Sequence, residues 1–352
     1  MIDLDDRAAL RAADPAGMLD AITELPERCR EGYRIGLDTR ELPRGEGVTS
    51  IVVCGIGGSA VPGDVLTALA APRLRLPVTV VRSPELPEFC SPHTLVVASS
   101  YSGDTAESLE LFEEAVARGC RIVAVTSGGA LARRCAELEI ACVTVRGGVM
   151  PRAAIGWTML GTLGALEAIG VLPSVASDLD DALSAMETLI DRIGPHVPAG
   201  SNRAKSLALA IGDRVPVAWG AEGIGAVAAA RLKTQFHENA KVPSFASAMT
   251  ELAHNEVEGW SEGRGAGFAI VALRHEGEHP HIASRFAPAL ELARASGALV
   301  EEVWALGRSS LARLLTLVQT GDIVATYLAM ARGVDPTPID AIARLKRALA
   351  DA

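Results

Sequence analysis

The chain has 352 residues, which is enough for about two domains of ordinary size. Hydrophobic residues make up 49% and aromatic residues 4%, a composition that favours layered α/β packing over an aromatic-rich β-sandwich. The formal net charge is −10 and no dense Lys/Arg run occurs, which argues against nucleic-acid binding, so an anionic ligand would be held by local devices such as helix N-termini.

The first part of the chain predicts helices followed by a parallel sheet. Residues 1–48 predict two short amphipathic helices and a linker rich in Gly and charge. Short apolar segments then alternate with helical segments, notably 105–119 and 129–138, a pattern typical of parallel strands covered on both faces. The strands are expected at 50–54, 78–82, 94–98, 121–126 and 140–145.

The second part repeats this pattern. Residues 151–210 are predicted to be largely helical, and a second series of strands is expected at 215–219, 266–273 and 298–303. A last helix, Pro338 to Leu349, follows a Pro-rich turn. The fold class predicted is α/β, with two α/β/α sandwich domains. The expected boundaries are a helical extension at 1–48, a first domain at 49–165, a second at 166–332 and a helical tail at 333–352.

The sequence favours a cytoplasmic protein. The N-terminus is acidic and lacks the apolar core of a signal peptide, and no uninterrupted apolar run reaches membrane-spanning length. The six cysteines form no C-x-x-C pair, and buried free thiols explain them best. We therefore expect neither a membrane nor a disulfide framework.

Two loops that follow predicted strands carry the residues of an anion site. In Gly55-Ile-Gly-Gly-Ser59, glycines let backbone N–H groups turn toward a ligand at a helix N-terminus. The second loop, Ser99–Thr105, is crowded with hydroxyl side chains and leads into a helix. Helix capping explains part of the second loop but not the number of hydroxyls, so phosphate binding is favoured.

The first loop also fits a Rossmann variant, because Gly55 to Ala60 matches G-x-G-x-x-A. That fold needs an acidic residue at the end of the second strand, which here ends in Arg82 and Ser83, so NADP binding is a poor alternative. Together the two loops resemble the phosphosugar-binding pattern of sugar isomerase (SIS) domains. The predicted fold is therefore two SIS-type domains.

Aldose–ketose isomerisation moves a proton between C1 and C2 through an enediolate. It needs a base, a cation for the developing oxyanion and an acid/base group that opens the ring, but no redox cofactor and, in principle, no metal. The densest polar segments are His-Glu-Asn-Ala-Lys-Val-Pro at 237–243 and Glu-Leu-Ala-His-Asn-Glu-Val-Glu-Gly-Trp at 251–260. Solvated helix ends explain such segments as well, and for His237 that explanation is favoured. For Glu238 and His254 function is favoured, mostly because of a resemblance to a known family.

These two segments resemble the bifunctional phosphoglucose/phosphomannose isomerase family. The segments Pro151-Arg-Ala-Ala154 and Arg332-Gly-Val-Asp-Pro-Thr-Pro338 add to the resemblance, which runs from residue 52 to residue 346. The resemblance implies a homodimer that converts glucose 6-phosphate, and mannose 6-phosphate as a second substrate, to fructose 6-phosphate. No cofactor and no metal are implied.

The resemblance also implies residue roles. Glu238 is the base that shuttles the C1/C2 proton, and Arg152 faces the enediolate oxygen. His254, donated by the neighbouring subunit, assists ring opening, and Lys346 acts at the ring, although the spacing also allows Arg344 in that place. Thr337 lines the C1–C2 end of the sugar and bears on substrate specificity, that is, on tolerance of the C2 epimer. The phosphate is held by Gly57, Gly58, Ser59, Ser100, Ser102 and Thr105.

Other chemistry is less favoured. The segment Arg274–His281 holds three His and two Glu, which allows a metal cluster, but its Gly and Pro favour a solvated loop. Residues 311–320 predict a buried core helix. A phosphosugar sensor without catalysis and an amino-sugar phosphate isomerase remain alternative functions.

Overall fold

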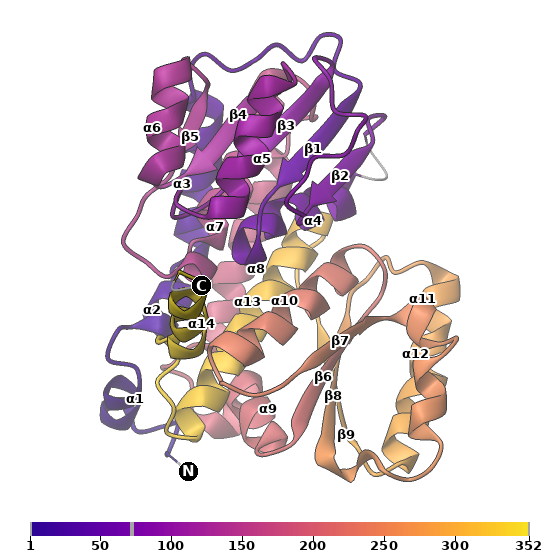
Figure 1. Ribbon diagram of the computed structural model, residues 1–352. Coiled ribbons are helices and arrows are strands. Elements are labelled where there is room, and N and C mark those ends of the chain that lie inside the picture. Colours follow the sequence, from indigo (N-terminus) through magenta and orange to yellow (C-terminus); the bar gives the residue numbers. More distant parts are fainter. Residues whose placement is uncertain (1, 71–73, 351–352) are drawn as a thin grey trace. The chain divides into compact units, whose positions relative to one another are not determined.

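The computed structural model describes residues 2–70 and 74–350 (Figure 1). The chain forms two compact units. The first-sheet unit comprises Glu24–Glu187 and Gly307–Arg313, and the second-sheet unit comprises Met1–Thr23, Thr188–Leu306 and Leu314–Ala352. Each unit is described by itself, and the domain boundaries expected from the sequence stay a prediction.

The first-sheet unit is built on a parallel sheet in the order β2-β1-β3-β4-β5. Every residue of β1 and β3 is buried, because helices cover both faces of the sheet. The strands span Ser50–Cys54 (β1), Val78–Val81 (β2), Thr94–Ser99 (β3), Arg121–Thr126 (β4) and Cys142–Thr144 (β5).

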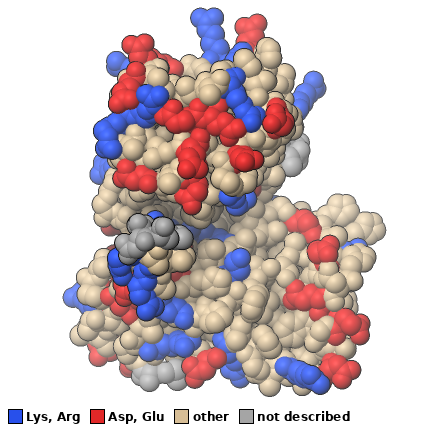
Figure 2. Space-filling view, viewed as in Figure 1, with Lys and Arg blue, Asp and Glu red and all other residues tan. Residues whose placement is uncertain are grey.

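Helices α5 (Ala106–Ala117) and α6 (Gly129–Leu138) cover one face of this sheet, and α4 (Val61–Ala70) and α7 (Ile155–Ile169) cover the other (Figure 1). Leu111 and Phe112 of α5 and Leu131 of α6 are fully buried in the core beneath them. The outer face of α5 is acidic, as Figure 2 shows, with Glu107, Glu110 and Glu113 exposed. This face does not suit a nucleic acid.

Helix α3 (Leu25–Asp38) packs against α7 almost backbone to backbone. A Cβ added at Gly36 would lie 2.2 Å from the Gly161 carbonyl oxygen, and one at Gly164 would lie 2.4 Å from the Tyr33 carbonyl oxygen. Both distances are shorter than the closest approach of two non-bonded atoms. Glycine is therefore required on both helices, despite its low helix propensity.

We expect Gly36→Ala to destabilise the protein. Alanine improves helix propensity by about 1 kcal/mol, but forcing the helices apart costs about 1–3 kcal/mol or more, so the net change is a loss. Urea unfolding measures it. Gly267→Ala is the control, because a Cβ there meets nothing within 4 Å. Equal midpoints for the two variants would contradict the close packing.

The second-sheet unit has a parallel sheet in the order β7-β6-β8-β9. Helix α12 (Pro280–Ala295) covers one face, where Phe286 and Leu290 are buried with Trp219 of β6, and α10 (Ile224–Glu238) packs against β6, β7 and β8. The strands span Val215–Gly220 (β6), Phe245–Ala248 (β7), Phe268–Arg274 (β8) and Leu299–Trp304 (β9).

The remaining helices complete or connect the units. They are α1 (Arg7–Ala13), α2 (Met18–Thr23), α8 (Ala176–Ile193), α9 (Arg203–Ile211), α11 (Met249–Leu252), α13 (Ser310–Ala331) and α14 (Asp340–Ala350). The Lys205 side chain of α9, 1% exposed, ties the N-terminal segment to its unit, because its ammonium donates to the Asp5 carboxylate at 3.0 Å and to the Pro195 carbonyl at 3.3 Å.

The predicted fold class is confirmed, with differences in detail. The N-terminal region holds α1, α2 and α3 rather than two helices, and the short strand β7 was not predicted. Its sequence, Phe-Ala-Ser-Ala, is too short and too small-sided to predict a strand by itself.

Helix α13 includes the core helix expected at 311–320. Among the described residues it is the one helix long and apolar enough to cross a membrane, by length and composition. Its most apolar window is 100% buried inside the protein. Core helices of globular proteins share these properties.

Candidate functional site

The two predicted anion-binding loops meet at the carboxyl edge of the first sheet. Strands β1 and β3 are parallel neighbours, so the loops that follow them leave the sheet at the same edge. The backbone N–H of Tyr101 donates to the Ser59 hydroxyl at 3.2 Å, which joins the loops directly. Burial raises the pKa of the Tyr101 phenol, so that side chain stays neutral at physiological pH.

The hydroxyls of the second loop are organised around its turn. Ser100, which is buried, donates to the Thr105 hydroxyl at 3.3 Å and accepts from the Gly103 N–H at 3.2 Å. Ser102 is exposed, and its hydroxyl accepts from the Asp104 N–H at 3.3 Å. The structure therefore joins the Ser100 and Thr105 hydroxyls by a hydrogen bond and holds the Ser59 hydroxyl against the backbone of the same loop. Ser102 of this loop is exposed to solvent.

Helix α5 begins directly after this loop, and no side chain among the described residues caps its N-terminus. Thr105 occupies the N-cap position, yet within the described chain its side chain makes no cap hydrogen bond. Asp104 does not serve as a cap for α5 either, because its carboxylate accepts from the Ala130 N–H of α6 at 2.8 Å. The first N–H groups of α5 therefore donate no hydrogen bond to a side chain at the N-cap, and helix N-termini with such groups are suited to bind phosphate.

A third loop, after β4, holds the second loop in shape. Gly103 has φ 73°, and a Cβ there would lie 1.9 Å from the Gly128 carbonyl oxygen. The Ser127 hydroxyl donates to the Tyr101 carbonyl at 2.7 Å. Sequence analysis missed this loop. The pair Gly128-Gly129 after a strand was the pattern that could have indicated it.

Arg152 belongs to the same unit. It lies in the short 3₁₀ helix η2 (Pro151–Ala153), next to the glycines of the first loop: a Cβ at Gly58 would be 4.0 Å from the Pro151 carbonyl oxygen. Arg152 is 3% exposed. A buried guanidinium beside the anion-binding loops is suited to a negatively charged ligand.

In the second-sheet unit, Glu238 is the last residue of α10 and is half-buried. A buried ion pair anchors this helix to α13. Arg231 donates to the Asp322 carboxylate through Nε at 3.1 Å and Nη2 at 2.7 Å, with both side chains 3% exposed. One turn further along α13, the Thr326 hydroxyl accepts from the Asn239 side chain at 3.2 Å. Both contacts fix the rotation of α10 about its axis and hence the direction of Glu238.

We expect Asp322→Asn to destabilise the protein by about 3–5 kcal/mol, because it leaves the Arg231 charge buried without its counter-charge. The double variant Arg231→Met/Asp322→Leu removes both charges, so it should lose much less stability. Urea unfolding of the two variants measures the difference. A double variant as unstable as Asp322→Asn would show that packing rather than charge pairing matters.

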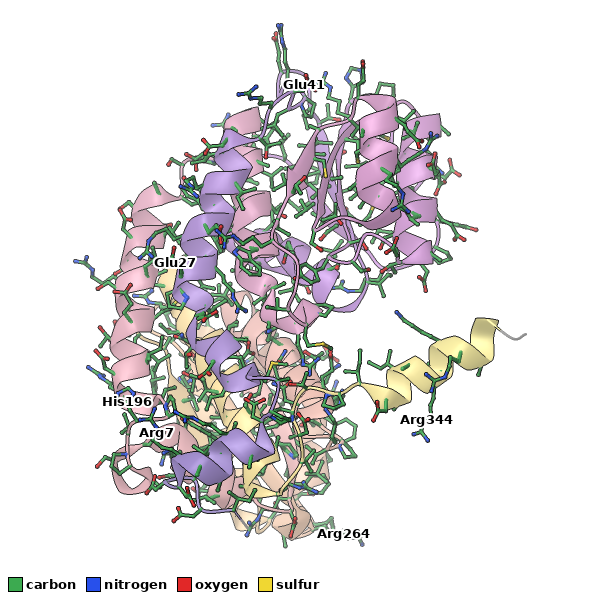
Figure 3. All side chains as sticks on the ribbon, turned by 90° about the vertical axis from the view of Figure 1, so that its left-hand side faces the viewer. Arg7, Glu27, Glu41, His196, Arg264 and Arg344 are labelled. Carbon is green, nitrogen blue, oxygen red and sulfur yellow. The ribbon has the colours of Figure 1, made fainter. Side chains whose placement is uncertain are left out.

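The other predicted residues of this unit lie after α10. His254 follows α11 and is exposed. Thr337 lies in the turn before α14, where its N–H donates to Asp335 at 2.9 Å. Lys346 and Arg344 are both exposed on α14, which Figure 3 shows extending from that turn with Arg344 labelled.

His237 has a structural contact, in keeping with the expectation for it. Its Nε2 lies 3.0 Å from the Ser244 carbonyl oxygen and 3.1 Å from the Ser244 amide nitrogen. It therefore ties the end of α10 to the chain that enters β7.

The expected solvated loop at 274–281 is wrong for its first part. Arg274 and His275 are each 8% exposed. Arg274 pairs with Glu278 at 2.8 Å and Glu302 at 2.9 Å, and stacks on Phe286 with its guanidinium carbon 3.9 Å from the ring centre. The burial of Arg274 depends on an ion pair and an aromatic ring supplied by other segments, so the composition of the loop does not predict it. Across residues 2–70 and 74–350, no group of three or more His, Cys, Asp and Glu side chains is placed to hold a metal ion.

Comparison with known proteins defines the class. The fold matches a structure titled as a glucose-6-phosphate isomerase like protein from Thermus thermophilus, with a TM-score of 0.65 and 21% identity over 99% of both chains. Residues 200–349 match the family described as the bacterial phospho-glucose isomerase C-terminal SIS domain. Residues 200–349 are thus similar to an SIS domain, and the fold of the chain resembles that of a glucose-6-phosphate isomerase like protein.

Sequence relatives narrow this class to one family. The bifunctional phosphoglucose/phosphomannose isomerase of Caldicellulosiruptor bescii is 33% identical over 336 residues, which cover 95% of this chain and 99% of that protein. The protein of the same name from Aquifex aeolicus is 33% identical over 302 residues, 85% of this chain and 90% of that protein. The chain belongs to the bifunctional phosphoglucose/phosphomannose isomerase family.

Proposed function

We propose that this protein interconverts glucose 6-phosphate, and mannose 6-phosphate as a second substrate, with fructose 6-phosphate. The observation that carries the proposal is the uncapped N-terminus of α5, lined by hydroxyls, in a chain of this family. A helix N-terminus with hydroxyl donors suits the phosphate of a sugar phosphate. The phosphate ligands are Gly57, Gly58, Ser59, Ser100, Ser102 and Thr105.

In this proposal Glu238 is the base. Its carboxylate takes the proton from C2 of the open-chain aldose and returns it to C1, through an enediolate whose oxygen faces the Arg152 guanidinium. The two C2 epimers give the same enediolate, because C2 becomes planar, so one base serves both. His254 and Lys346 assist ring opening, and Thr337 lines the C1–C2 end of the sugar. None of these steps calls for a metal or a redox cofactor.

We further propose that the protein is a cytoplasmic homodimer in which His254 acts on the site of the neighbouring subunit. Its exposure within one chain is compatible with that role. The cysteines at 29, 54, 90, 120, 135 and 142 are free, as expected in a reducing compartment.

Glu238→Gln should lower kcat by about 10²–10⁴-fold, because the amide cannot accept the proton, while substrate binding is kept. A coupled assay from each aldose 6-phosphate measures kcat, and calorimetry measures binding. A rate close to that of the unaltered protein would exclude Glu238 as the base. Binding without turnover in the unaltered protein would identify a phosphosugar sensor instead.

Ser102→Ala should raise KM for the sugar phosphate by about 10–100-fold with little change in kcat, because it removes a donor to a charged group that is bound equally before and during reaction. Ser102 is chosen because it is exposed and makes one contact within the loop, with the Asp104 N–H, whereas the buried Ser100 makes two. Ser206→Ala, on α9, is the control. An unchanged KM for Ser102→Ala would remove that residue from the phosphate site.

The substrate itself is tested with a panel of glucose, mannose and glucosamine 6-phosphates, each with and without EDTA. Turnover of the first two supports the proposal. Exclusive turnover of glucosamine 6-phosphate would favour an amino-sugar phosphate isomerase, and loss of activity with EDTA would contradict a metal-independent reaction.

A further inference from the structure

Lys241 adopts a backbone conformation that L-residues rarely adopt. Its φ is 55°, and among the described residues the non-glycine residues with positive φ are Glu41, Glu139 and Lys241. It lies just after α10, where the chain reverses and the Val242 N–H donates to the Phe236 carbonyl at 3.2 Å. Glycine is usual at such a position after a helix. Lysine is therefore an uncommon residue at this position.

The Lys241 side chain joins two segments of the second-sheet unit. Its ammonium donates to the Glu238 carbonyl at the end of α10 and, at 3.2 Å, to the Pro336 carbonyl. Carbonyls in the last turn of a helix lack intrahelical partners, and a positive charge is favourable there. Pro336 is buried in the turn that leads to α14. The ammonium therefore holds the end of α10 and this turn at a set separation.

A cavity of about 370 Å³ lies at this junction, lined by His237, Glu238, Lys241 and residues 338–342. The cavity thus has the proposed base on one wall and the first turn of α14 on another. Thr337, the residue proposed to line the C1–C2 end of the sugar, directly follows the Pro336 carbonyl that Lys241 binds. Movement of that turn would change the separation between the Glu238 backbone and Thr337.

We propose that Lys241 is a positioning residue: it clamps the turn at 336–338 to the end of α10, and this separation determines how well the reaction accepts each C2 epimer. The clamp is a property of the fold, and its consequence for epimer preference rests on the proposed function. Lys241 acts through Glu238 and Thr337, so it is not itself a catalytic residue.

Kinetics with both aldose phosphates test the consequence. Lys241→Met keeps the length of the side chain but removes the donor, so kcat should fall about tenfold and the ratio of kcat/KM for mannose to glucose 6-phosphate should change by about threefold or more. Lys241→Arg keeps a donor and should restore most of both. The control Lys233→Met, in the preceding helix α10, should change neither. An unchanged ratio in Lys241→Met would overturn the link to epimer preference.

Hydrogen exchange tests the clamp without any substrate. Amides in residues 333–343 should exchange about tenfold faster in Lys241→Met than in the unaltered protein, and Lys233→Met should leave them unchanged. Equal exchange in Lys241→Met would overturn the clamp. If the unaltered protein turned over no hexose 6-phosphate, the proposed function would be wrong. The exchange measurement would still show whether Lys241 holds the turn at 336–338 to the end of α10.

Lys241→Gly separates positioning from stability. Glycine adopts positive φ without strain, so this variant should unfold at a urea concentration no lower than the unaltered protein does, yet share the kinetic and exchange changes of Lys241→Met. A Lys241→Gly variant with unaltered exchange at 333–343 would show that the ammonium is dispensable, and would overturn the proposal.

Discussion

The candidate anion site depends on a contact between two stretches of backbone. Gly103 lies so close to the Gly128 carbonyl that no Cβ fits between them. This approach lets the loop after β3 lie directly against the loop after β4, and the Ser127 hydroxyl then bonds to the Tyr101 carbonyl. With its backbone held on that side, the loop can turn its hydroxyls toward the N-terminus of α5, because none of them is needed to cap the helix.

In the second-sheet unit, a buried ion pair helps to fix the helix that carries Glu238. The Arg231–Asp322 pair is buried between α10 and α13, where a misaligned pair would carry a large desolvation cost. The pair therefore favours one rotation of α10 about its axis and, with it, one direction of Glu238. Just past the end of α10, the charge of Lys241 has a similar part. Its ammonium donates to the Glu238 carbonyl, at a helix end where carbonyls lack intrahelical partners, and to the Pro336 carbonyl in the turn before α14.

Much of this was predictable from the sequence, because the information is local. Short apolar strands alternating with helices predict parallel sheets, and in a parallel sheet the loops after neighbouring strands share one edge. The crowd of hydroxyls in Ser99–Thr105 therefore indicated an anion site before the strand order was known. The roles of Glu238, His254, Lys346 and Arg152 came from family resemblance, because nothing local distinguishes a catalytic carboxylate from a solvated one.

The sequence by itself determined the fold class, the two glycine- and hydroxyl-rich loops and the family, since each depends on residues close together in the chain. The tertiary structure alone decided that Thr105 leaves α5 uncapped, that Gly103 meets Gly128, that Arg274 is buried and that Lys241 bridges to Pro336. These features join segments as far as 95 residues apart. Propensity and periodicity describe how a segment folds, whereas hydrogen bonds and steric contacts between distant segments follow only from how the segments pack.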